Sequence, residues 1–165
     1  MPQEYTLQQA LQQAIQAKKE LRDFYREAAG ITEDPAGRKV LQRLCDEVED
    51  NIGKFFKHYR QKDLGSLTEF LNTPPQRESV MLVELRKALD KKVPEKKARE
   101  LAMREEKAMA ESFRLAANRV VDPLARNLFL EVANDAERHY AVIQSEYEYQ
   151  VTHIHETDVA TYVRE

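Results

Sequence analysis

The last residues of the chain hold the densest group of side chains suited to metal chemistry. His153-Ile154-His155-Glu156 places two imidazoles on one side of the chain if this segment is extended, and Asp158 follows closely. Neutral imidazoles are common ligands of divalent metals, so the pattern predicts a metal clip. An ordinary surface tail is the alternative. Tyr147, Tyr149 and Tyr162 give the tail a further role, as anchors to the rest of the chain or to a second subunit.

Two other reactive side chains stand alone in the sequence. Cys45 is the one cysteine, which excludes an internal disulfide and a cysteine-rich metal knot. No cation lies beside it in sequence to activate a thiolate, so we expect a small core residue. His58 is expected to face solvent near the end of a helix, where a cation favours the negative pole of the helix dipole.

Long helices must position these side chains. The 165 residues are 33% charged and 42% hydrophobic, with only four glycines and no tryptophan, a composition that favours helices in one domain spanning 1–165. We predict helices over about 6–29, 35–60, 94–119 and 123–150. Thr6 and Gln9 form a capping box, and Gly30 is predicted to end the first helix in a left-handed conformation. Asp34-Pro35 and Asp122-Pro123 open two of the other helices.

Each predicted helix has one apolar seam, as a four-helix bundle requires. The connection over 61–93 is long enough to cross the bundle, so the predicted fold is all-α, with hairpins 6–60 and 94–150 joined by a crossover and followed by the tail 151–165. The crossover should contain a short helix with Val80, Leu82, Leu85 and Leu89 on its apolar face. The seams of the four long helices comprise Leu7, Leu11, Ala14, Leu21 and Tyr25; Leu41, Leu44, Val48, Phe55 and Tyr59; Ala102, Met109, Phe113 and Ala116; and Leu128, Val132, Ala136 and Ile143.

The second hairpin repeats the first at an offset of 88 residues. Asp34-Pro35 matches Asp122-Pro123, and Arg38 matches Arg126. Chance similarity between two helices rich in Ala, Glu and Arg is the competing explanation, but the matching Asp-Pro pairs favour a true repeat. Two equivalent hairpins facing each other would be related by a pseudo-twofold axis.

This pattern resembles the rubrerythrin-like branch of the ferritin-like superfamily. The residues that carry the resemblance are Ala14-Ile15, the run from Asp23 to Ala29, Asp34-Pro35, Val40-Leu41 and their counterparts 88 residues later. The resemblance implies a core in which each hairpin supplies a Glu from its first helix and a Glu-x-x-His from its second. These six side chains would hold two metal ions, usually iron.

Carried over residue by residue, most of these ligands are replaced. The first-helix positions are Lys18 and Glu106. The second-helix pairs are Val48 with Asn51, and Ala136 with His139. Only Glu106 and His139 keep the family's residue types. Glu47, Glu49, Asp135 and Glu137 lie one residue away, about 100° around their helices, so we do not expect them to replace the lost ligands.

The charges at these positions suggest a core that needs no metal. Lys18 and Glu106 bear opposite charges, whereas a dication beside a buried ammonium would be strongly disfavoured. We therefore predict a Lys18–Glu106 salt bridge in place of the metals, with Asn51 and His139 supplying hydrogen bonds. Two alternatives stay open: Glu106 and His139 could retain iron or another divalent metal, and the Lys18 stem could carry its amine to the end of the bundle.

The predicted function is that of a ferritin-like protein with a degenerate di-iron site, no catalytic residue and no required cofactor. The alternative is a metal-binding oxidoreductase or iron-handling protein. A net charge of -3 argues against nucleic acid as a partner, and the longest apolar run, Val80 to Val83, is too short to cross a membrane. No secretion signal is expected at the start, so we expect a cytoplasmic location. The resemblance implies a homodimer.

Overall fold

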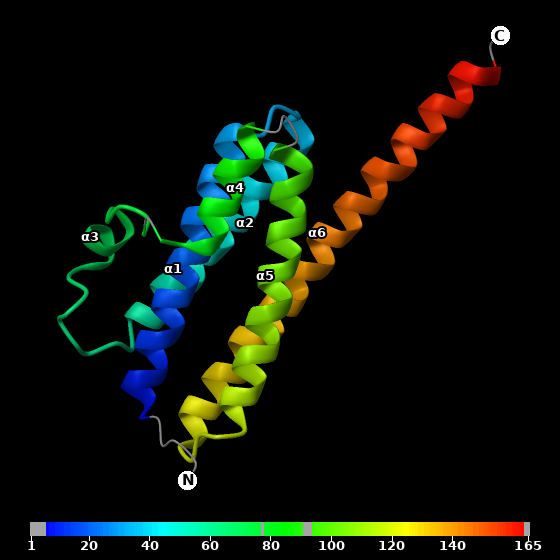
Figure 1. The fold of residues 1–165 in the computed structure, drawn as a ribbon. Helices are drawn as coiled ribbons and strands as arrows, with labels where there is room; N and C mark the ends of the chain where they lie inside the picture. The colour runs from blue at the N-terminus through cyan, green and yellow to red at the C-terminus, as the bar shows by residue number, and fades with distance from the viewer. Residues whose placement is uncertain (1–5, 77, 91–93, 164–165) are drawn as a thin grey trace.

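The computed structural model describes residues 6–76, 78–90 and 94–163, with side chains described over 6–76, 78–87 and 96–145. In these ranges the chain is helical, with no strand (Figure 1). The six helices are α1 (Leu7–Ile31), α2 (Pro35–Phe56), α3 (Leu67–Leu71), α4 (Val80–Asp90), α5 (Pro94–Ala117) and α6 (Pro123–Val163). None of the helices, as far as they are described, is long and apolar enough to span a bilayer.

The predicted signals at the start of helices are confirmed. The Thr6 hydroxyl accepts a hydrogen bond from the Gln9 backbone N–H, and the Gln9 side chain accepts one from the Thr6 N–H, which completes the capping box of α1. The Asp34 carboxylate accepts from the Gly37 N–H at the start of α2. These bonds satisfy backbone donors that the first turn of a helix leaves unpaired.

The end of α1 differs from the prediction. Gly30 lies inside the helix, and the described glycine with a positive φ is Gly65, at 74°. Thr32 ends the helix instead, because its backbone N–H and its hydroxyl both donate to the Ala28 carbonyl.

The end of α2 comes four residues before the predicted limit, at Phe56. Here the Gln8 side chain of α1 donates to the His58 carbonyl and accepts from the Arg60 N–H. These contacts from a neighbouring helix satisfy backbone groups that would otherwise have continued α2.

The crossover contains the predicted short helix, α4, and also an unpredicted one, α3. Within α4, Val80 is 65% exposed, contrary to expectation, whereas Met81, Leu82 and Leu85 are buried. Val80 is the first residue of the helix, so the buried face begins one position later. Leu89 lies outside the described side chains.

The final helix corrects the prediction of an extended tail. α6 continues to Val163 as a single helix of 41 residues and passes beyond the ends of α2 and α5 (Figure 1). No Gly or Pro follows Pro123 to interrupt it. Because positions two apart on a helix are separated by about 200°, the reasoning that put His153 and His155 on one side of the chain fails. Their side chains lie outside the described residues.

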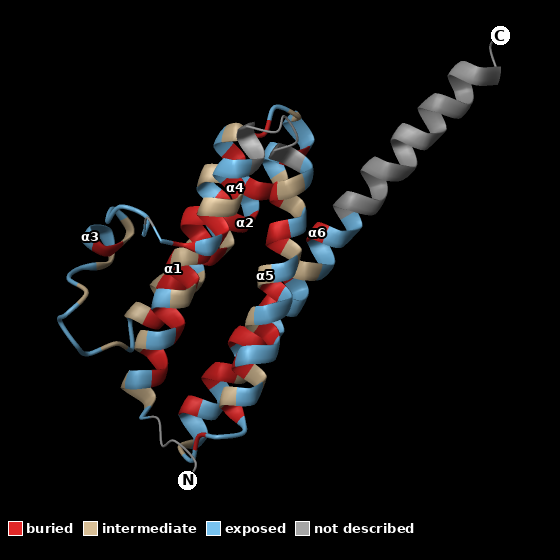
Figure 2. Ribbon diagram, viewed as in Figure 1, coloured by how far each residue is buried: buried red, intermediate tan, exposed pale blue. Residues whose placement is uncertain are grey.

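The long helices form two antiparallel hairpins, α1 with α2 and α5 with α6. α1 also packs against α5 and α6, and α4 packs against α5 and α1, which joins the hairpins around one core. Figure 2 shows buried residues along α1, α5 and the part of α6 that packs against them. The predicted seams are buried, apart from Leu7, Tyr59, Met109 and Ala116, which are partly exposed and pack against the core.

The repeat has a structural counterpart in the loops between paired helices. Arg38 donates through Nε to the Thr32 carbonyl at 2.9 Å. Arg126 donates through a terminal nitrogen to the Val120 carbonyl at 2.8 Å. Both the arginines and the carbonyls are 88 residues apart. In each hairpin, the equivalent arginine therefore donates a hydrogen bond to the equivalent loop carbonyl.

A buried polar centre as candidate functional site

Lys18 of α1, Glu106 of α5 and His139 of α6 are 0% exposed, so the bundle encloses three ionisable side chains. Val48 and Ala136, at two of the other aligned positions, are equally buried, while Asn51 is half-buried. Five of the six positions are therefore fully buried, as the seams predicted, and the sixth is half-buried. Lys18 does not extend to the end of the bundle or to solvent.

Glu106 is held through one of its two oxygens. Its Oε1 accepts a hydrogen bond of 2.5 Å from the Tyr25 hydroxyl and lies 3.2 Å from His139 Nδ1. Burial, together with the negative charge of Glu106 and the hydrogen bond to it, raises the pKa of Tyr25 well above its usual value. The phenol thus keeps its proton and serves as a donor to the carboxylate.

His139 links this buried carboxylate to one nearer the surface. Its Nε2 lies 3.1 Å from Glu47 Oε2, and the Glu47 side chain is 29% exposed. Glu47 was not expected at the centre because its backbone position is one residue away from the seam, but its long side chain spans the offset. A neutral imidazole has one N–H and can donate to only one of the two carboxylates, whereas the doubly protonated ring can donate to both.

Lys18 shows the main departure from the predicted arrangement. Its amine has no hydrogen-bond partner, so the predicted direct salt bridge with Glu106 is absent. Burial lowers the pKa of Lys18, and the charge of Glu106 opposes that shift. The two charges interact electrostatically without direct contact. Tyr25 and His139 both contact Oε1 of the Glu106 carboxylate, and Oε2 has no partner.

The predicted hydrogen bonds around this pair are only partly present. His139 contacts Glu106, as expected. Asn51 does not: its buried Nδ2 has no partner, and neither does Glu106 Oε2. The connected side of the centre is Tyr25–Glu106–His139–Glu47, whereas Lys18, Glu106 and Asn51 each have one unpaired polar atom.

The residues present do not fit a pair of metal ions. Within the described part of the chain, no group of three or more His, Cys, Asp or Glu side chains is arranged to hold a metal ion. Val48 and Ala136 have no donor atom, and both ring nitrogens of His139 already face carboxylates. A dication at this centre would also be repelled by the Lys18 ammonium, because charges interact more strongly in the low dielectric of a protein interior.

A second buried polar cluster was missed by the sequence analysis. Lys19 Nζ lies 2.5 Å from Asp23 Oδ2 and donates to the Thr73 carbonyl, and Arg22 pairs with both Asp23 and Glu49. Arg22 also donates to the Leu71 carbonyl. This cluster, Lys19, Arg22 and Asp23, clamps the crossover against α1. The four-residue spacing of Lys19 and Asp23 was a signal of their pairing, but not of their burial.

Cys45 and His58, the two isolated reactive side chains of the sequence, lie where the sequence predicted. Cys45 is buried, as expected, and burial raises the pKa of its thiol from 9.0 to about 11.

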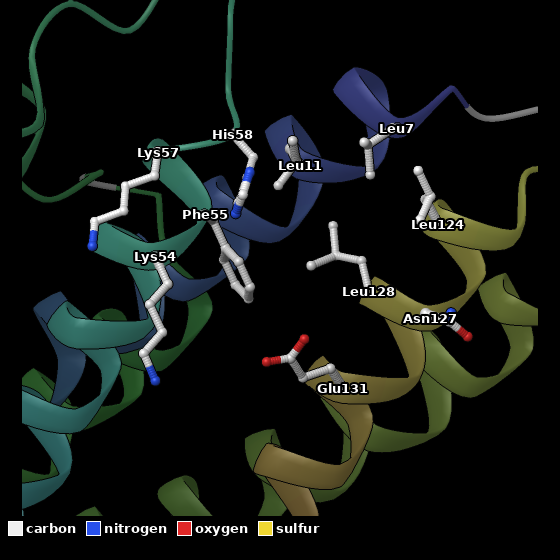
Figure 3. A pocket seen from close by; sticks show the side chains of 10 residues that line it. All are labelled: Leu7, Leu11, Lys54, Phe55, Lys57, His58, Leu124, Asn127, Leu128 and Glu131. Atoms are coloured by element: carbon white, nitrogen blue, oxygen red, sulfur yellow. The ribbon is translucent and has the colours of Figure 1, made fainter.

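His58 is exposed, as expected, and borders a pocket of about 650 Å³ at one end of the bundle. Figure 3 shows its ring and the Glu131 carboxylate directed toward the apolar walls, with Lys54 and Lys57 directed away. The lining residues are Leu7, Leu11, Lys54, Phe55, Lys57, His58, Leu124, Asn127, Leu128 and Glu131.

Comparison with known proteins adds no further assignment. No family model, curated protein or solved structure matches this chain.

Proposed function

We propose that this chain is a ferritin-like helical bundle, similar to rubrerythrins, whose di-iron site has become a metal-free polar core. Its role would then be non-enzymatic, and depend on the bundle itself for assembly or for binding a partner. The observation that carries the proposal is the complete burial of Lys18 at a position aligned with a family Glu ligand, within electrostatic range of Glu106.

Charge balance gives the physical reason. Four carboxylates around two dications are close to neutral only when the metals are bound. Here one cation and one anion occupy the two first-helix positions, so the core is balanced with no ion present. Two apolar residues, Val48 and Ala136, remove further charge from the second-helix positions.

Elemental analysis of protein purified without chelator tests the proposal directly. We expect no stoichiometric iron or other transition metal, and no ferric absorbance after addition of ferrous iron and oxygen. Two tightly held metal ions per chain would overturn it.

A set of variants tests whether Lys18 is the decisive replacement. Lys18→Glu, Val48→Glu, Asn51→His and Ala136→Glu together rebuild the six-ligand pattern, and this variant is expected to bind two metal ions. The matched control carries the last three changes and keeps Lys18, and we expect it to bind metal much more weakly. Equal binding by the two variants would show that the ammonium does not exclude metal.

One observation favours the alternative, a residual metal site. Glu106 Oε1 lies 3.2 Å from His139 Nδ1, and both side chains are ligand types for iron or zinc. One metal ion per chain, lost in His139→Ala but retained in His58→Ala, would support this alternative over the metal-free core.

A further inference from the structure

Three buried polar atoms at the aligned ligand positions have no partner: Lys18 Nζ, Glu106 Oε2 and Asn51 Nδ2. They belong to three different helices, α1, α5 and α2. A buried donor or acceptor without a partner costs roughly 1–3 kcal/mol, and more when it is charged, so native proteins pair almost all of them with protein or water. Three such atoms at aligned positions, two of them on the electrostatically linked Lys18 and Glu106, call for a common explanation.

The repeat explains why no protein group reaches them. Tyr25 donates to Glu106, and adding 88 to Tyr25 gives Phe113, while Glu106 is itself the counterpart of Lys18. The residue that corresponds to the donor of Glu106 thus has no hydroxyl to offer Lys18. In the same way His139, which contacts Glu106, corresponds to Asn51 on the side of Lys18. The side chains around Glu106 are therefore joined by hydrogen bonds, whereas their counterparts around Lys18 are not.

The three atoms also define what would satisfy them. Two are donors, the ammonium of Lys18 and the amide of Asn51, and one is an acceptor, the free oxygen of Glu106. A small molecule that accepts from the first two and donates to the third completes all three. A positive or negative ion would satisfy only one kind and would disturb the balance of Lys18 and Glu106.

We propose that the core binds internal water between Lys18, Glu106 and Asn51, so that the ammonium and the carboxylate are joined through water. This inference rests on the proposed function, since it assumes that no metal occupies the centre. The water makes the centre a buried, hydrated ion pair: Lys18 retains hydration inside the bundle, and Glu106 uses both its oxygens.

Two measurements on the whole chain test the inference. A high-resolution crystal structure should show density for ordered water within hydrogen-bond distance of Lys18 Nζ and Glu106 Oε2. Oxygen-17 magnetic relaxation dispersion in solution should detect long-lived internal water. Lys18→Met should lower that signal, because methionine has a similar length and no N–H, whereas Glu105→Gln, one position outside the centre, should leave it unchanged.

The outcomes separate this inference from the proposed function. A direct contact between Lys18 and Glu106, with no water in the density and no internal-water signal, would overturn the inference alone. A metal ion at the centre, seen by anomalous scattering, would overturn the proposed function and the inference together. If Lys18→Met fails to fold, the density and the relaxation signal of the unaltered protein still decide the question.

Discussion

Tyr25 donates a 2.5 Å hydrogen bond to Glu106 and so connects the first helices of the two hairpins at the middle of the core. Lys18, although it carries the opposite charge to Glu106, makes no such contact. The direct link to Glu106 from the first hairpin is therefore a phenol–carboxylate bond, and the cation acts on the carboxylate at longer range. This division of roles makes the contributions of Tyr25 and Lys18 separable by mutation.

Tyr25→Phe removes the donor and leaves the ring in place. Hydrogen bonds to charged groups contribute about 1.5–3 kcal/mol, so we expect the free energy of unfolding to fall by roughly 2 kcal/mol. Tyr59→Phe is the matched control, because the Tyr59 hydroxyl bonds Asp63 at the surface, and its loss should cost much less. Urea unfolding of both variants measures the two losses. Equal losses would show that the bond to Glu106 contributes no more to the free energy of unfolding than a surface hydrogen bond.

Lys18→Met should change how stability depends on pH. Burial lowers the pKa of Lys18 below its usual 10.5, so between the folded-state pKa and 10.5 the unfolded chain binds more protons than the folded one. The free energy of unfolding then rises with pH through that window. The Met variant lacks this rise, so its stability relative to the parent should fall as the pH approaches 10.5.

The measurement is a series of denaturant titrations on both proteins from neutral pH upward. Cys45 and the tyrosines also titrate in this range, but they are present in both proteins and largely cancel in the difference. A difference that stays constant with pH would mean that Lys18 titrates alike in the folded and unfolded chain.

Cys45 should be unreactive while the protein is folded. Its pKa is raised from 9.0 to about 11, which alone lowers the thiolate fraction near pH 8 by about 100-fold, and its burial hinders access as well. We expect a thiol reagent such as Ellman's reagent to react far more slowly with the native protein than with the urea-unfolded chain. Because Cys45 is the one thiol, similar rates in the two states would contradict its buried placement.

Much of the fold could be predicted because it depends on local rules. The spacing of Leu11, Ala14 and Leu21 indicates which face of α1 is buried, and Thr6 and Asp34 mark where helices begin. Those features need only neighbours within one or two turns. The ferritin-like arrangement itself stays a prediction.

The site was harder to predict because it depends on which side chains meet across helices. The aligned positions correctly placed Lys18, Glu106 and His139 in the interior. Opposite charges did not specify geometry, however, and Tyr25 rather than Lys18 bonds Glu106. Likewise, Glu47 reaches His139 by the length of its side chain, which helical position alone does not show.

The buried clamp of the crossover escaped prediction for a similar reason, and it gives the last test. Lys19, Arg22 and Asp23 look like solvent-facing residues by helical pattern. However, the end of α3 and the residues that follow it lie over this cluster and supply the carbonyls of Leu71 and Thr73. Asp23→Ala leaves two buried cations without their shared carboxylate, a change that costs about 3–5 kcal/mol when a buried pair is broken. The matched control is Glu27→Ala, which removes the α1 partner of the half-exposed Arg86 and should cost about 1 kcal/mol or less. Limited proteolysis should also cut the crossover faster in Asp23→Ala than in the control, whereas equal stability and equal cleavage would show that the clamp does not hold the crossover in place.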